Sequence, residues 1–155
     1  MCCPVSAEIS TKGLLALRGQ PRQSRWITLD QLRIDAFAAI TEDTAPLHVD
    51  PLSADAQAFG GTLAHGFLTL SLLSTLVYDI VPRLAGHTSL NAGFDRVRFV
   101  APVPSGSRVR GIFTLETLEK TQAGQLAVLW AVQVEIEGAD KPALVARWLN
   151  RFIPT

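Results

Sequence analysis

The amino-acid sequence predicts an α+β domain in which one long apolar helix is wrapped by a curved antiparallel sheet. Two patterns indicate this fold class. Residues 66–81 are apolar on nearly every side of a helical wheel, which is typical of a helix buried on all faces. Most of the chain after Pro82 alternates between apolar and polar residues, as strands with one buried face do. Packing the helix against these strands buries both apolar surfaces at once.

Four segments carry the alternating pattern. Their ranges are 90–99, 109–115, 126–136 and 144–152. The first changes parity partway along, which predicts a β-bulge near Asp95 or Arg96. Because short turns rich in glycine separate the later segments, the sequence predicts that the four strands form an antiparallel meander.

A helix is predicted upstream, ending near Thr41. Thr28 and Gln31 have the spacing of a capping box, so Thr28 is the expected N-cap. Apolar residues then recur at helical intervals and predict the buried face. They are Leu29, Leu32, Ala36, Phe37 and Ile40.

The chain after this helix is predicted to leave helical geometry. Pro46 disfavours a helical conformation at Ala45, which indicates an extended segment. Asp50 followed by Pro51 resembles an N-cap and a first-turn proline, which predicts a short helix over residues 51–59.

Composition and charge exclude several classes of protein. At 155 residues the chain is expected to form one domain over residues 25–155, preceded by an N-terminal arm over residues 1–24. Basic and acidic residues both number 14 and no basic run is present, which argues against nucleic acid. The N-terminus lacks a signal-peptide pattern, and the apolar run over residues 67–81 is too short and too polar to span a bilayer. We therefore expect a cytoplasmic protein without a membrane partner.

The histidines and cysteines predict neither a metal site nor a cofactor. Cys2 and Cys3 are adjacent, which suits neither a disulfide framework nor paired metal ligands. His48, His65 and His87 lack the spacing of metal ligands, and His65 and His87 are interpreted as orienting or loop residues.

The stretch over residues 38–73 holds the candidate catalytic residues. Asp43 and His48 supply a carboxylate and an imidazole that can transfer protons, and Pro46 breaks the chain between them so that both can reach one point. Gly66 opens the long helix and offers a backbone N–H at its positive end. Structural roles stay open as alternatives, because Asp43 can end a helix and Gly66 can serve a tight helix entry.

Three segments resemble the MaoC-like dehydratases, and more closely the subgroup that includes nodulation protein N. They read TEDTAPLHVDP, FGGTLAHGFLTLSLL and NAGFDRVRFVAPVPSGSRVR, and the resemblance extends from about Trp26 to the C-terminus. It implies a hotdog fold, a homodimer and the hydration of 2-enoyl-CoA thioesters to (R)-3-hydroxyacyl-CoA.

The resemblance implies a role for individual residues. Asp43 and His48 match the catalytic pair, and Gly66 matches the glycine whose N–H binds the thioester oxygen. Ser74 stands where related hydratases place an active-site serine, although it can instead bond a backbone carbonyl one turn back. We group His65 with Gly66 and Ser74 as the predicted oxyanion and substrate-binding residues.

The sequence departs from the family pattern at two positions beside the candidate site. Glu42 stands where a glycine usually precedes the catalytic aspartate, and Ala45 where a residue such as asparagine is common. A second carboxylate next to Asp43 disfavours ionisation of both groups.

Several arginines have two alternative interpretations. They can meet the phosphates of coenzyme A, or they can lie on the solvated face of the sheet, which the alternating pattern favours. They are Arg96, Arg98, Arg108 and Arg110.

Three functions are consistent with these residues. The first is a hydratase acting on acyl-CoA thioesters. The second is a thioesterase of the same fold, in which a carboxylate-activated water attacks the carbonyl. The third is a noncatalytic acyl-binding or signalling module. The intact pair of Asp43 and His48 ahead of an Ala-His-Gly helix start favours the hydratase.

Overall fold

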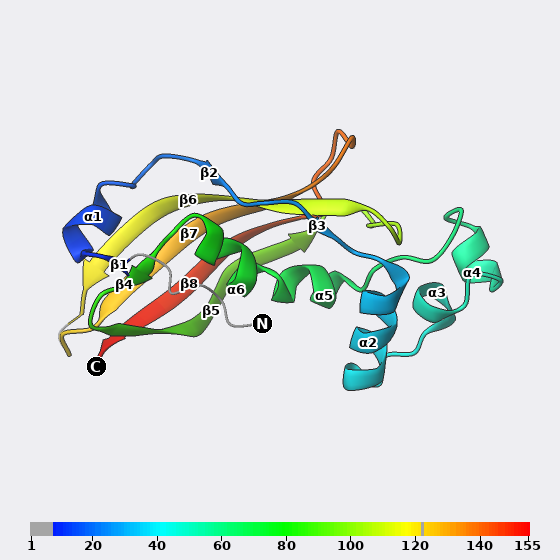
Figure 1. The fold of residues 1–155 in the computed structure, drawn as a ribbon, viewed down its shortest axis with the longest axis horizontal. Coiled ribbons are helices and arrows are strands. Elements are labelled where there is room, and N and C mark those ends of the chain that lie inside the picture. The colour runs from blue at the N-terminus through cyan, green and yellow to red at the C-terminus, as the bar shows by residue number, and fades with distance from the viewer. Residues whose placement is uncertain (1–7, 122) are drawn as a thin grey trace.

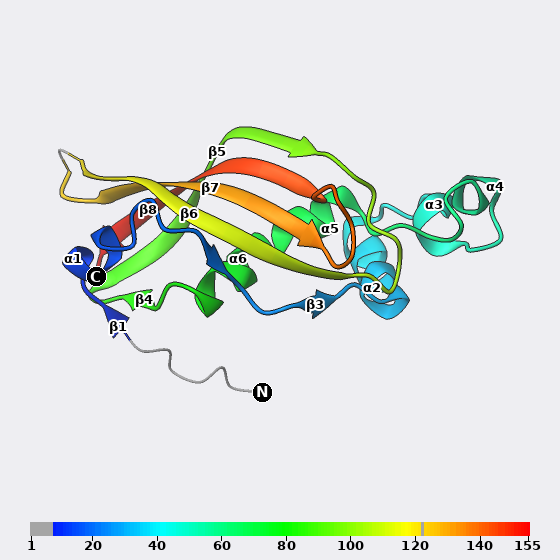
Figure 2. The ribbon, with the colours of Figure 1, turned by 90° about the horizontal axis from the view of Figure 1, so that it is seen from above.

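A computed structural model describes residues 8–121 and 123–155, so Cys2 and Cys3 lie outside the described residues. A curved sheet lies over a row of short helices, and three further helices stand beyond one end of the sheet (Figure 1). Seen from above, the long strands run side by side across the row of helices (Figure 2). Within the described residues, no helix combines the length and apolar character needed to cross a membrane.

Four long antiparallel strands make up most of the sheet. They are β5 (His87–Phe99), β6 (Arg108–Lys120), β7 (Leu126–Ile136) and β8 (Leu144–Pro154). Their order is β6-β7-β8-β5, so the predicted meander is wrong for β5, which pairs with β8 instead of β6. Residues 100–107 form a connection long enough to cross the end of the sheet, whereas a two-residue turn pairs only adjacent strands.

The predicted irregularity in β5 is confirmed. The register of β5 against β8 shifts between Phe94 and Arg96, which places a bulge at Asp95. A second shift lies between Asn91 and Gly93.

The central helix consists of three consecutive pieces. These are α5 (Gly66–Ser71), α6 (Leu73–Leu76) and the 3₁₀ turn η1 (Val77–Asp79). Leu72 joins the first two with φ −67° and ψ −17°, so the pieces form one helical rod. The expectation of burial on all faces is wrong, because Phe67 and Tyr78 are 68% and 58% exposed. The sheet covers only one side of the rod.

Helix α2 (Gln31–Thr41) ends at the predicted residue but differs in its cap. The N-cap is Asp30, whose carboxylate accepts a hydrogen bond from the N–H of Arg33, so the prediction of Thr28 is wrong. The predicted buried face is right for Leu29, which is fully buried, and for Phe37, which packs against the core, but wrong for other members. Leu32 and Ile40 are 78% and 83% exposed, whereas Ile34 is fully buried.

Two short helices follow α2. Pro46 is the first residue of α3 (Pro46–Val49), so the non-helical segment is limited to residues 42–45, where Ala45 has ψ 135°. Helix α4 (Ala54–Gln57) is capped by Ser53 and not by Asp50. The carboxylate of Asp50 instead accepts from the N–H of Leu52 within a turn.

The described N-terminal residues pack along the sheet. β1 (Glu8–Ile9) pairs in parallel with β4 (Arg83–Leu84), and α1 (Thr11–Leu15) contributes the fully buried Leu14. β2 (Arg22–Gln23) and β3 (Ile27–Thr28) both pair with β6.

Candidate active site

Three side chains from separate segments meet where the central helix begins. Asp43 follows α2, His48 lies in α3, and His65 directly precedes α5. One nitrogen or carboxylate oxygen from each residue lies within 4.8 Å of the others. The predicted pair of Asp43 and His48 is therefore brought together, and His65 joins it.

The hydrogen bond made by His48 determines its tautomer. Nδ1 of His48 lies 2.7 Å from the carbonyl oxygen of Leu63. Because a carbonyl oxygen only accepts, Nδ1 must carry the hydrogen. In the neutral ring, Nε2 then keeps its lone pair and can accept a proton.

His65 is buried against the catalytic pair. It is 2% exposed, and its Nε2–H donates to the backbone carbonyl of Asp43 at 2.9 Å. Its ring stacks on the ring of His48 with centroids 3.8 Å apart, and Phe37 packs at 5.1 Å. Nδ1 of His65 is buried without a partner among the described residues, and Nε2 also lies 4.0 Å from a carboxylate oxygen of Asp43.

Gln31 and Thr62 hold α3 in place, and sequence reasoning did not find this role. The amide of Gln31 donates to the carbonyl of His48 at 2.7 Å, and the hydroxyl of Thr62 donates to the side-chain oxygen of Gln31. Gln31 was predicted to belong to a capping box, but it contacts a residue 17 positions later. No local pattern in the sequence signals such a contact.

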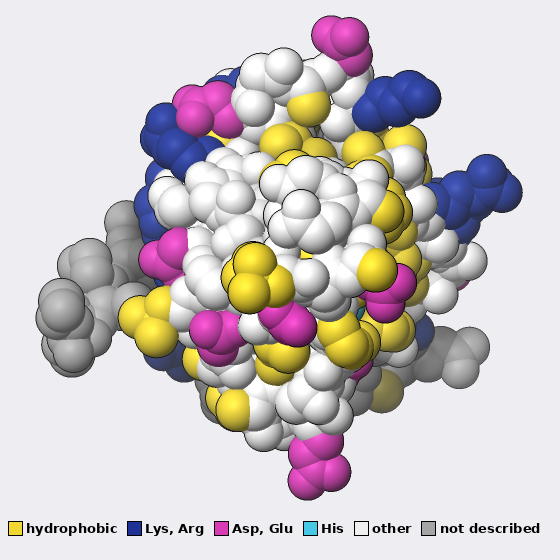
Figure 3. Space-filling model, turned by 90° about the vertical axis from the view of Figure 1, so that its right-hand side faces the viewer, with side chains coloured by type: hydrophobic (Ala, Val, Ile, Leu, Met, Phe, Trp, Pro, Cys, Tyr) yellow, Lys and Arg dark blue, Asp and Glu magenta, His cyan; other side chains and the backbone are white. Residues whose placement is uncertain are grey.

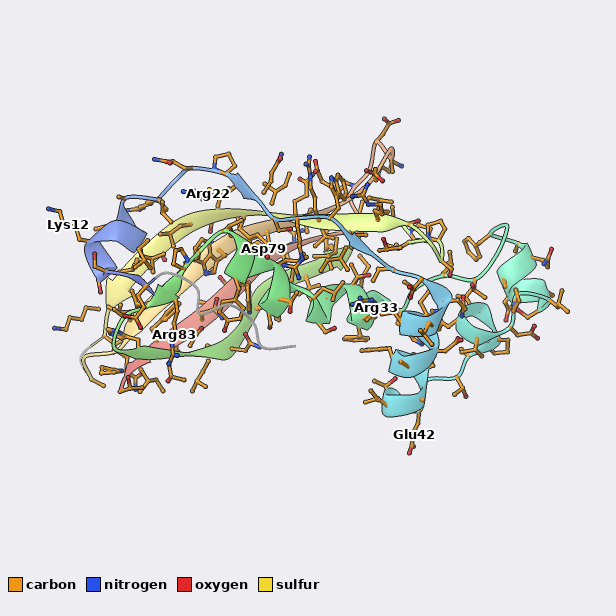
Figure 4. The ribbon with its side chains drawn as sticks, viewed as in Figure 1. Lys12, Arg22, Arg33, Glu42, Asp79 and Arg83 are labelled. Atoms are coloured by element: carbon orange, nitrogen blue, oxygen red, sulfur yellow. The ribbon has the colours of Figure 1, made fainter. Side chains whose placement is uncertain are left out.

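Glu42 occupies a backbone conformation that favours glycine. Its φ is 61°, and it is the one non-glycine residue with positive φ in the described part of the chain. The family's glycine at this position therefore has a conformational reason at the end of α2. Glu42 sits at the tip of α2 with its side chain directed away from the molecule (Figure 4).

Gly66 has a backbone N–H that no helical carbonyl accepts, and its Cα lies close to the ring of Phe99. As the first residue of α5, it has an N–H without an acceptor inside the helix. His65 makes no side-chain cap bond at this end. A Cβ at Gly66 would lie 3.0 Å from the ring of Phe99, so a larger residue requires that ring to move. Both the oxyanion role and the tight entry weighed for Gly66 are consistent with this geometry.

Ser74 and His87 do not join the cluster. Ser74 lies eight residues beyond Gly66, about 12 Å along a helix, and lines cavities beside the later part of the rod. His87 begins β5, where its Nδ1 bonds the carbonyl of Ala85.

Two of the four arginines weighed for coenzyme A binding form ion pairs on the sheet. Arg108 pairs with Glu137 at 2.7 Å, and Arg110 pairs with Glu135 at 2.6 Å. Arg110 also stacks over the ring of Trp26 at 4.5 Å. These contacts suit the solvated-face interpretation for this pair.

The geometry of the cluster suits proton transfer better than metal binding. Metal ions approach histidine along the lone pair in the ring plane, but the rings of His48 and His65 are stacked at 27°. The absence of a metal stays a prediction.

Backbone and side chains that are neither charged nor hydrophobic make up much of the surface over this end of the molecule (Figure 3). Hydrophobic and acidic side chains alternate across it, while lysine and arginine lie toward the rim (Figure 3). Hardly any histidine surface is visible there, in agreement with the burial of His65 and the partial burial of His48.

The fold and the cluster define a class of protein. Residues 15–137 match the family described as "MaoC like domain", and the chain belongs to this MaoC-like family. The hotdog fold is confirmed by the solved (R)-hydratase from A. caviae involved in PHA biosynthesis. That structure has a TM-score of 0.71 and 26% identity, and the match covers 86% of this chain and 94% of that one.

Relatives of known sequence match over nearly their whole length. Nodulation protein N of Rhizobium meliloti (strain 1021) is 47% identical over 145 residues, which is 92% of this chain and 90% of the relative. The 3-hydroxyacyl-thioester dehydratase Z of Mycobacterium tuberculosis (strain ATCC 25618 / H37Rv) is 41% identical over 131 residues, which is 84% and 87% respectively. The predicted resemblance to MaoC-like dehydratases and to the nodulation protein N subgroup is thus confirmed.

Proposed function

We propose that this chain is a hydratase that interconverts trans-2-enoyl-CoA and (R)-3-hydroxyacyl-CoA. The observation that supports this proposal most is the cluster at the start of α5. There a carboxylate oxygen of Asp43 and a ring nitrogen of His48 lie within 4.8 Å of each other, while Nδ1 of His48 bonds the carbonyl of Leu63. The first free N–H of the helix, on Gly66, follows directly after His65. Two relatives support the reaction class by name, a dehydratase of 3-hydroxyacyl thioesters and an (R)-hydratase.

Each group has a distinct role in the proposed reaction. The oxygen of a water molecule bonds to the β-carbon of the enoyl thioester, and one proton of that water passes to Nε2 of His48. The Asp43 carboxylate accepts a hydrogen bond from the water and orients it. The proton on Nε2 then passes to the α-carbon, so the addition balances and His48 returns to its neutral form.

Negative charge develops on the thioester oxygen between these two proton transfers. A backbone N–H directed at that oxygen stabilises the enolate. We assign this role to Gly66, because its N–H has no acceptor within α5. A side chain at this position would also meet the ring of Phe99.

One assay distinguishes this function from a thioesterase or a binding module. Purified protein is incubated with crotonyl-CoA while the conjugated absorbance and free thiol are followed in parallel. Hydration removes the conjugated absorbance without releasing thiol, and chiral analysis of the product should yield the (R)-3-hydroxy isomer. Release of thiol at the rate of substrate loss would identify a thioesterase. No change in either signal would identify a noncatalytic module.

We also propose that the chain acts as a homodimer joined along β5. Among the described strands, β5 has no partner on its outer side. Exposed apolar residues follow this edge, and unpaired strand edges of this kind promote association. They include Leu90, Phe94, Phe99 and Val100.

Sedimentation equilibrium tests the dimer directly. The expected mass is twice the 16.8 kDa of the chain. Leu90→Lys should shift the mass toward the monomer, because a lysine on a strand edge opposes pairing. Ile40→Lys, which changes an exposed apolar residue on α2, is the matched control and should leave the mass unchanged. A monomeric wild type would contradict this proposal.

A further inference from the structure

A cavity beside the later part of the central helix combines a mostly apolar lining with several hydrogen-bonding side chains. It has a volume of about 530 Å³ and lies between the later part of the central helix and strands β5 and β8. Hydrogen-bonding side chains line it from three elements. They include Ser74 on the helix, Ser89 and Asn91 on β5, and Asn150 on β8.

Hollow space extends from this cavity toward the candidate active site. A smaller cavity of about 230 Å³ shares Ser74, Asn91 and Trp148 with the large one. It reaches Phe67, the residue after Gly66. A chain whose thioester oxygen meets the N–H of Gly66 can therefore follow the helix into the large cavity.

Beside Trp148, whose buried Nε1 has no partner among the described residues, the cavity holds Asn150, a buried carboxamide with hydrogen-bonding groups to spare. It is 4% exposed and stands on β8 between the buried residues Trp148 and Phe152. Among the described residues, its side chain makes one hydrogen bond, from Nδ2 to Oδ1 of Asn91 at 3.3 Å. That bond uses one N–H and leaves the other N–H and the oxygen of the carboxamide available.

We propose that the acyl chain accepted by this site carries a hydroxyl group beyond its reacting carbons. The inference rests on the proposed hydratase function and narrows its substrate class. A plain alkyl chain would remove water from the carboxamide of Asn150 without replacing its hydrogen bonds. A hydroxyl both donates and accepts, so it matches the unused oxygen and N–H of Asn150. Sites built around such a bond discriminate strongly against the analogue that lacks it.

Steady-state hydration kinetics test the proposal on the wild-type protein. The substrates are trans-2-decenoyl-CoA and a set of isomers that carry one hydroxyl between the middle and the end of the chain. We expect at least one hydroxylated isomer to exceed the plain substrate by about tenfold or more in kcat/KM. Equal values for all isomers, or a preference for the plain chain, would overturn the proposal.

Two variants link any preference to the carboxamides. Asn150→Leu has similar volume but cannot hydrogen-bond, so the preference for the hydroxylated isomer should disappear. Asn91→Leu changes the exposed hydrogen-bond partner of Asn150 on β5 and should reduce the same preference. If Asn150→Leu does not fold, Asn91→Leu alone tests whether the carboxamides cause the preference. A preference that survives in every folded variant would overturn the assignment.

Crotonyl-CoA separates this inference from the proposed function. Its acyl chain is too short to reach from Gly66 to Ser74, so folded variants should hydrate it at the wild-type rate. If the wild type hydrates crotonyl-CoA but shows no preference among the longer substrates, only the proposal of a hydroxyl-bearing acyl chain is overturned. Failure of the wild type to hydrate crotonyl-CoA overturns both proposals.

Discussion

A carbonyl oxygen only accepts hydrogen bonds, and two carbonyls at this site therefore identify one ring nitrogen of each histidine that carries a hydrogen. Nδ1–H of His48 donates to the carbonyl of Leu63, and Nε2–H of His65 donates to the carbonyl of Asp43. The two rings stack, and they bond these carbonyls through different ring nitrogens. His48 is thus prepared to accept a proton on Nε2, while His65 holds the backbone of Asp43.

The first prediction concerns His65 as a positioning residue. His65→Leu removes the donor to the carbonyl of Asp43, and we expect kcat for crotonyl-CoA to fall by about tenfold with a smaller change in KM. His65→Gln can place an amide N–H near the position of Nε2 and should recover most of this loss. Thermal unfolding of both variants serves as the control for folding. Equal kcat values for the leucine and glutamine variants would show that the hydrogen bond is not needed.

A second prediction concerns the backbone at Glu42. Because φ is 61° at this residue, Glu42→Gly relieves left-handed strain and should stabilise the fold by about 1 kcal/mol. Ala39→Gly, an exposed interior position of the same helix, should destabilise it by a similar amount. Urea denaturation with an unchanged m-value measures both. Destabilisation by both glycines would contradict the strain assigned to Glu42.

The candidate residues were predictable to different degrees. Asp43, His48 and Gly66 were predicted because residue type, a proline break and a helix start lie close together in the sequence. The contact of Gln31 with the carbonyl of His48 was not predictable, since it joins residues 17 positions apart. The stacking of His65 on His48 likewise depends on how α3 meets the start of α5.

At the scale of elements, α2 shows which helix face the fold buries. Ile34 is fully buried and Leu32 is exposed, although both are apolar. They are two positions apart, so they lie on different faces of the helix. Ile34→Ala should lower the free energy of unfolding by about 2–5 kcal/mol, because it leaves a cavity in the core. Leu32→Ala should change it by less than about 0.5 kcal/mol. Chemical denaturation of the two variants checks the assignment, and equal losses would contradict it.

Strands were predicted more accurately than helix faces. Alternation predicted residues 126–136, which form β7, and the parity change predicted the bulge at Asp95. Periodicity within one segment does not reveal its partner, so the pairing of β5 with β8 was missed. Part of the buried face of α2 was misassigned, because Leu32 and Ile40 are apolar but exposed.

At the scale of the molecule, the sheet and the α2–α4 segment have different roles: the sheet supports the central helix, and the segment supplies the proposed proton-transfer residues. The sheet packs one side of the central helix, and residues 31–57 stand beyond the end where that helix begins (Figures 1 and 2). The candidate site therefore lies at a junction, with its donor N–H on the helix and its proton-transfer groups on the adjoining segment. This arrangement leaves the long cavity beside the helix for the rest of a substrate.

The central claim is that Asp43 and His48 add water to an enoyl thioester. Its most direct test is the kcat/KM for crotonyl-CoA hydration by the wild type, Asp43→Asn and the matched control Asp50→Asn. Asp50 lies seven residues further along, and its carboxylate bonds the N–H of Leu52 within a turn. We expect Asp43→Asn to lose a factor of about 100 or more while Asp50→Asn stays within about twofold of the wild type. A folded Asp43→Asn protein with a near-wild-type rate would contradict the account.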